Sequence, residues 1–517
     1  MIADWLFANN RGKHLGGVLA LTVFFLVVAF FHLESTPPLW WDEGWTLSVA
    51  RNWVEHGHYG QFQAGVPAPG GLEAAFPLTG LVALSFRLLG VGVLQGRLVG
   101  VLFAFGVLGL LYILGSRLYS RPVGWGALFV LLLLTGHPQI NPLLSGRQVL
   151  ADVPVVFYLL AGYLCFYWAF QRPLIFLPLA AIAWGVALNT KAQALPFWLI
   201  SLVVPLVLVL MARRWRVGLF IGLAIILSLT SWQLVGWLTG AILLGQMLPG
   251  QPVEGLFSVV VVVPDKELRF YALSMALLFA LPLIAGLFWT AWCFLKMRSW
   301  RHIEQPENLL QLALLVLSGS WFAWYLLLSN GGERYLATPV ALGSLFTAKM
   351  LYDFSQGYQV RATVGRVSGL LTGKDRSLAA LGGSFALLLV VYGLVIAGLT
   401  YWITLRSADT SAQIVADALN HQVPAGSLVE SYDSEIFFFL TQPYHYPPDQ
   451  VHGDLLRRYL LDAQHPIAYD PLAADPDYLV VGPVSAKWRL YAEVLAGGAF
   501  RPLLEQGSYT IYERIRP

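Results

Sequence analysis

The sequence predicts an α-helical polytopic membrane protein that ends in a small extracytoplasmic α/β domain. Apolar residues make up 57% of the 517-residue chain and charged residues only 12%, about half of the charged fraction that is usual in soluble domains. Apolar runs of roughly 20 residues, enough to cross about 30 Å of hydrocarbon, recur between Leu15 and Trp402. From Arg406 to Pro517 the chain is polar and rich in Asp, His and Tyr, which predicts a separate soluble domain.

About eleven apolar segments are predicted to cross the membrane as helices. The basic residues Arg11 and Lys13, with His14, precede the first segment and hold the N-terminus in the cytoplasm. No small-residue cleavage pattern follows this segment, so we expect it to be retained as a span. The predicted spans are residues 15–33, 97–117, 122–140, 153–170, 174–189, 193–211, 217–239, 269–296, 309–328, 335–352 and 378–403.

A further apolar stretch, from Phe76 to Leu94, decides on which side of the membrane every later loop lies. If it lies in the interface as juxtamembrane helices, the basic loops face the cytoplasm, as the positive-inside rule requires. If it spans, those loops move outside and the rule fails. We therefore place Phe76 to Leu94 on the outer surface of a bacterial-type plasma membrane, with the C-terminal domain outside. The basic residues concerned are Arg117, Arg121, Arg172, Arg213, Arg214, Arg216, Lys296, Arg298, Arg301, Arg361, Arg366, Lys374 and Arg376.

Two adjacent carboxylates, Asp42 and Glu43, follow the first predicted span in the run Trp-Trp-Asp-Glu-Gly-Trp at 40–45. An acid beside a bilayer is costly unless it faces a polar cavity or a partner, so such residues are candidates for catalysis, transport or ion coupling. The alternative is an interfacial turn within an aromatic belt, which the three tryptophans fit equally well.

Under this topology the few charged side chains of the outer loops collect near the ends of different spans. Their position predicts a shared cavity that holds both acidic and basic groups. Taken singly, each residue is more simply explained as an exposed loop charge or a snorkelling side chain. The residues are Asp42, Glu43, Glu73, Arg147, Asp152, Lys191, Glu333 and Arg334.

The polar C-terminal segment is predicted to form an α/β domain over residues 406–517, after a membrane module over residues 1–405. Strands are expected near residues 426–432, 477–482 and 507–515, and a helix over 486–495. Three acids, Glu430, Asp433 and Glu435, lie near one strand end, where they could touch an acceptor. A solvated strand end is the favoured explanation for them.

Four landmarks along the membrane part form a recognisable order. The first is Trp-Asp-Glu-Gly at 41–44, and the second is the proline-bearing stretch 73–90, which ends in Leu-Leu-Gly. The third is the segment 145–154, with an Arg and a following Asp. The fourth is a pair, Asn-Thr-Lys-Ala at 189–192 and Gly-Glu-Arg-Tyr-Leu-Ala-Thr-Pro at 332–339. Together they resemble the GT-C glycosyltransferases, in particular the branch of the dolichyl-phosphate-mannose protein mannosyltransferases and the bacterial lipid A aminoarabinose transferase.

The second landmark departs from that family at one position. Its members usually carry Lys-Pro-Pro or His-Pro-Pro there, whereas this chain has Ala75-Phe76-Pro77. A basic, substrate-binding residue is therefore missing at this place.

The resemblance implies an enzyme that moves a monosaccharide from a polyprenyl-phosphate donor to an acceptor hydroxyl at the outer membrane surface. The acceptor can be a lipid, a glycan or a protein. A carboxylate is needed to take the proton of that hydroxyl, and Asp42 is the candidate base, with Glu43 sharing the task. Single displacement would invert the anomeric carbon, since no second carboxylate is assigned as a nucleophile.

Negative charge gathers on the donor phosphate as the glycosidic bond breaks, and fixed cations stabilise that charge in the transition state. Lys191 and Arg334 are the candidates. Arg147 is either a third cation or the structural partner of Asp152. Further residues expected to bind substrate or to hold the site are Glu73, Asp152, Glu333 and Tyr335.

No cofactor is required by the sequence, although a divalent cation is possible. Asp42, Glu73 and Asp152 offer hard oxygen ligands, and His56 or His58 could add a nitrogen. The net charge of +3 follows from the basic cytoplasmic loops and gives no reason to expect a nucleic-acid partner.

Two other classes of protein share some of these features. A transporter or flippase also has many spans, but it tends to place ionisable residues within spans and to show internal repeats, and neither is found here. A noncatalytic membrane protein that binds glycan would tolerate degenerate landmarks such as Ala75-Phe76-Pro77.

Overall fold

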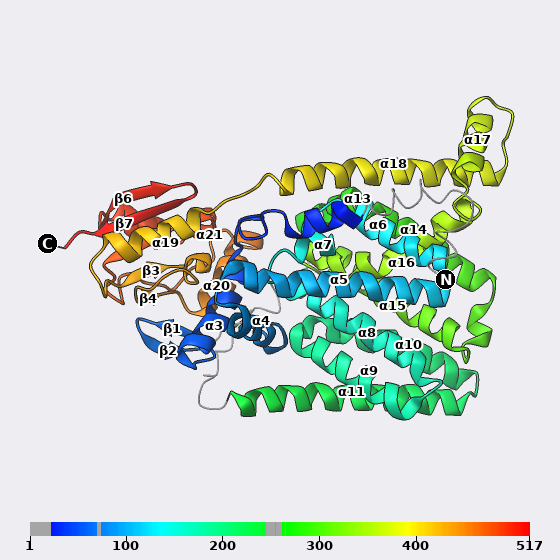
Figure 1. Ribbon diagram of the computed structural model, residues 1–517, viewed down its shortest axis with the longest axis horizontal. Helices are drawn as coiled ribbons and strands as arrows, with labels where there is room; N and C mark the ends of the chain where they lie inside the picture. The colour runs from blue at the N-terminus through cyan, green and yellow to red at the C-terminus, as the bar shows by residue number, and fades with distance from the viewer. Residues whose placement is uncertain (1–21, 70–73, 244–253, 255–260, 264, 517) are drawn as a thin grey trace.

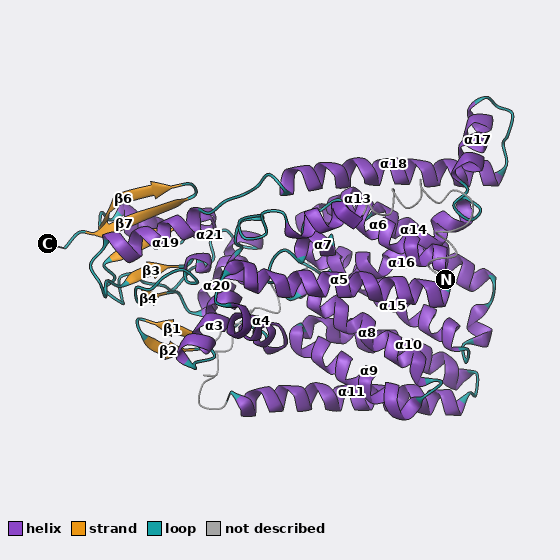
Figure 2. Cartoon of the chain, in the orientation of Figure 1, coloured by secondary structure: helices purple, strands orange, loops and turns teal. Residues whose placement is uncertain are grey.

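The computed structural model describes residues 22–69, 74–243, 254, 261–263 and 265–516 (Figure 1). Long helices run side by side as an elongated bundle, and a small sheet lies at one end of it, which we call the sheet-bearing end. Figure 2 shows that the strands are confined to this end. The helical membrane architecture with a small C-terminal sheet is thus as expected.

Each predicted span overlaps helical residues. Seven helices of the described residues are long and apolar enough to cross a membrane, or eight if one bent pair counts as a span. The bundle consists of helical residues 22–30, α5 (Val93–Leu118), α6 (Arg121–Leu133), α8 (Asp152–Ala169), α9 (Pro173–Thr190), α10 (Leu195–Met211), α11 (Trp215–Ile242), α13 (Lys266–Phe279), α14 (Leu281–Lys296), α15 (Pro306–Leu327), α16 (Ala337–Phe354) and α18 (Leu378–Thr404).

Burial distinguishes the centre of the bundle from its rim. Helix α16 is buried without interruption from Ala337 to Ala348, the pattern of a helix surrounded on all sides by others. Helices α11 and α18 expose apolar side chains along their length, for example Leu219, Ile226 and Leu388. In a bilayer such side chains face lipid, which is as apolar as they are.

Two predicted spans differ from the structure. The span expected over 269–296 is broken, because α13 and α14 meet at 84°. Pro282 occupies the first turn of α14, where its ring cannot continue the preceding helix. The span expected over 122–140 ends early, at Leu133, and the chain around Pro138 is not helical, since the residue before a proline disfavours the helical region.

Short elements cover the sheet-bearing end. The run at 40–45 is not a turn but the start of helix α3 (Trp41–His56), which is followed by the hairpin β1 (Gln61–Gln63) and β2 (Val66–Ala68). The stretch expected as juxtamembrane helix forms α4 (Phe76–Leu89), which lies against α3 (Figure 1). The other short helices of the chain are α7 (Pro142–Ser145), η1 (Ala192–Ala194), η2 (Ser299–His302), η3 (Glu333–Leu336) and α17 (Val360–Leu371), and α17 lies at the opposite end of the bundle (Figure 1).

The C-terminal part builds a five-stranded sheet in the order β4-β3-β5-β7-β6. Strand β3 is parallel to β4 and β5, whereas β7 is antiparallel to β5 and β6. Its strands are β3 (Val429–Ser431), β4 (Tyr444–His445), β5 (Tyr478–Val481), β6 (Phe500–Gln506) and β7 (Tyr509–Arg514), and its helices are α19 (Ser411–Gln422), η4 (Ser434–Ile436), α20 (Asp449–Leu460), α21 (Pro483–Trp488) and α22 (Ala492–Ala496).

The strands expected from the sequence coincide with β3, β5 and β7, while the expected helix over 486–495 is split into α21 and α22. The split falls at Arg489, which has a left-handed backbone with φ of 53°, a conformation that ends a helix. The expected boundary between residues 405 and 406 falls between α18 and α19. A division of the chain there into two domains stays a prediction.

Candidate functional site

Helix α3 places two carboxylates side by side in its first turn, because Asp42 and Glu43 follow directly on its first residue, Trp41. Acidic side chains in a first turn are stabilised by the exposed N–H groups and the positive end of the helix dipole. Successive residues on a helix point in different directions, so the two carboxylates meet different partners.

Glu43 is fully buried and paired with Arg97 of α5. The guanidinium donates two hydrogen bonds to the carboxylate, from Nε to Oε1 at 2.8 Å and from Nη2 to Oε2 at 2.7 Å, and both side chains are 0% exposed. The Val149 N–H adds a third bond to Oε1 at 3.1 Å. A carboxylate so fully engaged is placed to hold α3 on the bundle, not to take a proton from a substrate as the sequence suggested.

Arg97 was missed as a site residue. It stands at the edge of the first long apolar run after Phe76, where a single arginine is usually a boundary residue. Only the fold shows that its guanidinium also donates to the Leu33 carbonyl, at 2.9 Å, and so joins α5 to the segment before α3.

Asp42 pairs with Arg334 of η3, through Oδ2 and Nη1. Unlike Glu43, these side chains are partly accessible, with exposed fractions of 12% for Asp42 and 29% for Arg334. The third and fourth landmarks of the sequence are likewise joined, because Lys191 Nζ lies 2.5 Å from Asp152 Oδ1. Two ion pairs with access to solvent therefore stand at the ends of α3, α8, α9 and α16.

The ring of Tyr335 connects the two pairs. Lys191 Nζ lies 5.3 Å from the ring centroid and the Arg334 guanidinium 5.7 Å, both within the range of cation–π attraction. Trp324 of α15 packs edge-on against the same ring. We call the resulting set, Asp42, Arg334, Tyr335, Lys191 and Asp152, the ionic row.

Arg147 is not part of the ionic row. Its guanidinium donates to backbone carbonyls of the segment before α3, at Phe31 (2.6 Å) and Thr36 (2.7 and 3.2 Å), and also to Val28. Burial, with Arg97 nearby, lowers the pKa of Arg147 to about 10. The alternative of a structural pair between Arg147 and Asp152 is wrong, and the interior position of Arg147 suits a brace for the backbone better than a phosphate ligand.

The other predicted site residues lie apart from the ionic row or outside the described part. Glu333 accepts a hydrogen bond from the Tyr271 hydroxyl, and Glu73 lies outside the described residues. His58 is buried and bonds to the Ala68 carbonyl at 3.0 Å, while His56 faces Glu55. Among the residues that the structure describes, no three His, Cys, Asp or Glu side chains are grouped to hold a metal ion.

The C-terminal part contacts α3 directly beside Asp42. Trp41 Nε1 donates to the Tyr432 carbonyl at 2.6 Å, and Ser434 Oγ donates to the Trp41 carbonyl at 2.5 Å. A Cβ atom on Gly44 would lie 2.3 Å from the Glu435 Cα, so only glycine permits this approach. These contacts could not be predicted from the sequence, because they join residues about 390 positions apart.

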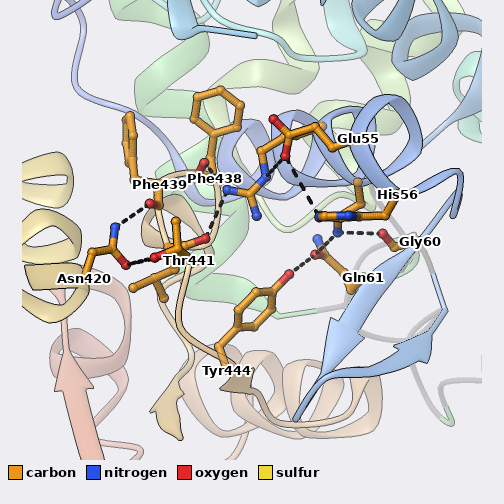
Figure 3. A network of polar contacts seen from close by, with 12 residues as sticks. Glu55, His56, Gly60, Gln61, Asn420, Phe438, Phe439, Thr441 and Tyr444 are labelled. Atoms are coloured by element: carbon orange, nitrogen blue, oxygen red, sulfur yellow. Dashed lines mark hydrogen bonds and ion pairs between the residues drawn. The ribbon is translucent and has the colours of Figure 1, made fainter. Parts of the chain in front are cut away.

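A second set of polar contacts joins the same two parts farther along α3 (Figure 3). Arg51 donates to the carbonyls of Phe438 and Leu440, at 2.7 and 3.1 Å. The Tyr444 hydroxyl donates to Gln61 Oε1 at 2.8 Å. The sheet thus holds α3 and the β1–β2 hairpin from one side while the bundle holds them from the other.

The three acids of the C-terminal part are buried, so the expectation of a solvated strand end is wrong. Glu430 accepts bonds from His445, Tyr469 and Tyr491. Asp433 accepts from the backbone at the start of α21, at Gly482 (2.9 Å) and Val484 (2.8 Å). Glu435 is 1% exposed, and burial, together with the charge of Asp433, raises its pKa to about 8.

A cavity of about 540 Å³ opens beside this junction, between the end of the first span and α19. Leu33, Leu94 and Phe439 give it apolar walls, and Asp409 and Tyr509 give it polar ones. Of the described residues that line it, none belongs to the ionic row, so this cavity and the charged groups of the row are separate features.

Comparison with known proteins gives a structural answer only. No protein-family model and no curated protein sequence matches the chain. Its structure is similar to ArnT from Cupriavidus metallidurans bound to undecaprenyl phosphate, with a TM-score of 0.58 and 15% identity over 97% of this chain and 98% of that one. The apo form of that protein matches with a TM-score of 0.55 and 14% identity, over 98% of this chain and 99% of that one. The chain has the GT-C fold.

A second GT-C protein supports the same assignment. The Archaeoglobus fulgidus oligosaccharyltransferase, in a complex with Zn and sulfate, matches with a TM-score of 0.50 and 14% identity, over 96% of this chain and 73% of that one. The match to ArnT includes both the bundle and the C-terminal sheet of this protein, because nearly the whole of both chains is covered. The family resemblance drawn from the four landmarks is thus confirmed at the level of fold.

Proposed function

We propose that the protein is a membrane glycosyltransferase that moves a monosaccharide from a polyprenyl-phosphate donor to an acceptor hydroxyl on the outer face of the membrane. The observation that carries this proposal is the ionic row. It combines one carboxylate that can take a proton with two cations that can receive a phosphate, on a fold that ArnT uses while bound to undecaprenyl phosphate.

The two cations suit one phosphate. In the structure Arg334 is neutralised by Asp42, and Lys191 by Asp152. A donor phosphate between them offers the planar guanidinium two oxygens and the ammonium a point contact. It would draw Arg334 from Asp42 and leave that carboxylate free. The Tyr335 ring, which both cations face, would keep them on the same side.

The reaction then needs one displacement. The acceptor hydroxyl loses its proton to Asp42 while its oxygen bonds to the anomeric carbon. The bond from that carbon to the phosphate oxygen breaks, and the electron pair leaves with the phosphate, where Arg334 and Lys191 stabilise the added charge. Attack from the side opposite to the phosphate inverts the anomeric configuration. Glu43, with Arg97, keeps the first turn of α3 in place.

The test is loss of sugar from a defined donor. Purified protein in nanodiscs is incubated with a panel of polyprenyl-phosphate monosaccharides, with water or added lipid as acceptor, and each donor is followed by mass spectrometry. We expect turnover of one donor by the wild type and a loss of at least about 100-fold in Asp42→Asn, within the range for removal of a general base.

A matched control is available at the other end of α16. Asp353 pairs with Lys349 at 2.5 Å and, like Asp42, is partly exposed. It lies in the last turn of α16, whereas Arg334 of the ionic row lies just before the first turn of that helix. Asp353→Asn should therefore turn over the donor as the wild type does. Undiminished turnover in Asp42→Asn would assign the base elsewhere, and absence of both turnover and donor binding across the panel would reject the proposal.

One observation favours a transporter or flippase as the second candidate. The break of 84° between α13 and α14 resembles the discontinuous helices that build transporter sites. In the same nanodiscs a flippase would leave the donor chemically intact, and in liposomes it would move the donor between leaflets. Movement without sugar loss would support this candidate over the transferase.

A further inference from the structure

The C-terminal part supplies an aromatic residue beside the proposed base. His452 of α20 stacks on Trp41, with ring centroids 5.0 Å apart and 22° between the planes. Trp488 flanks the same imidazole, with centroids 5.7 Å apart, and the Tyr432 hydroxyl lies 2.5 Å from His452 Nδ1. The imidazole is therefore held on two sides and at one nitrogen.

Trp41 is the residue that precedes Asp42, and it contacts both the C-terminal part and Trp45. Its indole N–H donates to the Tyr432 carbonyl, and its own carbonyl accepts a hydrogen bond from the hydroxyl of Ser434, the first residue of η4. Its ring lies between Trp45, with centroids 5.6 Å apart, and His452. Because Trp41 opens α3 and directly precedes Asp42, a displacement of its backbone would also move the Asp42 carboxylate relative to Arg334.

The protonation state of His452 also suits its position beside the ion pair. Its surroundings contain both members of the ion pair, Asp42 and Arg334, as well as the Tyr432 hydroxyl. Burial lowers its pKa to about 4, with Asp42 opposing that shift and Arg334 adding to it. The ring is thus neutral near pH 7, so it packs against Trp41 without competing with Arg334 for the Asp42 carboxylate.

We propose that His452 is a positioning residue for Asp42, acting through its stack on Trp41, and that the C-terminal part is for this reason an integral piece of the transfer site. The proposal rests on the proposed glycosyl transfer. It predicts that the ring, and not the imidazole nitrogens, is what Asp42 requires, since the stack fixes Trp41 while Nδ1 only secures the ring to Tyr432.

The test compares His452→Ala with His452→Phe in the donor assay. We expect His452→Ala to lower kcat by about 10-fold to 100-fold, since a base displaced by about 1 Å costs up to that much, while the KM for the donor stays within about twofold because Lys191 and Arg334 are untouched. His452→Phe keeps a ring on Trp41 and should restore kcat to within about threefold of the wild type.

The matched control is His465→Ala. His465 lies in the same part of the chain and pairs with Asp454 at 3.2 Å, so it tests the general effect of losing a C-terminal histidine. Both kcat and the KM for the donor should stay at wild-type values in this variant. If His452→Ala does not fold, His452→Leu against His452→Phe gives the same comparison at nearly equal volume.

A readout without donor separates this inference from the proposed function. Hydrogen exchange at the first turn of α3, where the Gly44 N–H bonds to the Trp40 carbonyl at 2.9 Å, should quicken in His452→Ala but not in His452→Phe or His465→Ala. If the wild type turns over no donor but the variants show this exchange pattern, the proposed glycosyl transfer is rejected while the positioning role of His452 stands. A wild-type kcat in His452→Ala, or equal losses in the Ala and Phe variants, would overturn the positioning role.

Discussion

At the scale of single residues, burial divides the charged groups of the site into two kinds. The pair of Glu43 and Arg97 is closed to solvent on both sides, whereas Arg334 and Lys191 keep 29% and 16% of their side chains exposed. A buried ion pair cannot exchange partners without leaving a charge uncompensated. A partly exposed pair can open toward an anion, so only the second kind is suited to a substrate.

We predict that Glu43→Gln destabilises the protein by about 3–5 kcal/mol, because it leaves the buried Arg97 without a counter-charge. Thermal unfolding in detergent, followed by tryptophan fluorescence, measures this as a clear fall in the midpoint. The control is Glu513→Gln, which breaks an exposed pair with Arg501 and should change stability by less than about 1 kcal/mol. Equal midpoints for the two variants would contradict a bracing role for Glu43.

The sequence predicted the residues of the ionic row but not the residues that hold helix α3 in place beside it. Asp42, Lys191 and Arg334 stand in motifs whose order resembles a family, so each could be named before the fold was known. Arg97 and His452 stand in no such motif. Their roles come from contacts with Glu43 and Trp41 that only tertiary packing creates, and a single sequence carries no signal for such contacts.

At the scale of elements, every member of the ionic row sits at or next to the end of a helix. Asp152 begins α8 and Lys191 follows the end of α9, and Arg334 lies in η3, one turn before α16. Helix ends at one surface of the bundle bring side chains from distant parts of the chain together. The starts of α3 and α8 also leave backbone N–H groups unpaired by the helix, which suits the binding of an anion.

We predict that Lys191→Gln raises the KM for the donor by about 10-fold to 100-fold. The loss corresponds to one charge-assisted hydrogen bond, about 1.5–3 kcal/mol, and glutamine can still bond to Asp152 and so keep the end of α9 in place. Donor titrations in the nanodisc assay measure the change. Lys349→Gln alters the equivalent pair at the far end of α16 and should leave KM unaffected; a similar rise in both variants would remove Lys191 from the phosphate site.

Element types were predictable where the apolar pattern was long, and less so near prolines. The 26 residues of α5 and the 27 of α18 correspond closely to apolar runs. The early end of α6 and the break between α13 and α14 were not foreseen, because hydropathy averages over Pro138 and Pro282 while the backbone responds to each. The start of α3 was missed for another reason, since a membrane-surface run rich in tryptophan fits a turn equally well.

At the scale of the whole molecule, α3 belongs to two apolar cores at once. Leu47 and Ala50 pack into the core of the bundle. Trp45 and Val49 pack into the second core, with residues of the C-terminal sheet such as Leu479. The base of the proposed site, Asp42, therefore lies on the helix that joins the two cores. A change in the packing of one core against the other would displace this residue.

Glu435 gives this junction a pH dependence. Its carboxyl is buried against Gly44, and its pKa is raised from 4.5 to about 8 by burial first and by the charge of Asp433 second. A carboxyl whose folded pKa is raised binds its proton more tightly in the folded state. The folded protein therefore loses stability as pH rises from the unfolded value of 4.5 toward 8, and the loss levels off above that pH.

We predict that the thermal midpoint of the wild type falls between pH 6.5 and pH 8, and that Glu435→Gln, which stays neutral, removes most of this fall. His452, whose pKa is lowered from 6.5 to about 4 in the folded protein, is present in both proteins, so it does not contribute to the difference between them. Glu505→Gln alters an exposed acid of β6 and should follow the wild type at both pH values. A fall of equal size in Glu435→Gln would show that another group causes the pH dependence. Asp433, which is also buried and whose pKa is also raised by burial, would then be the next residue to substitute.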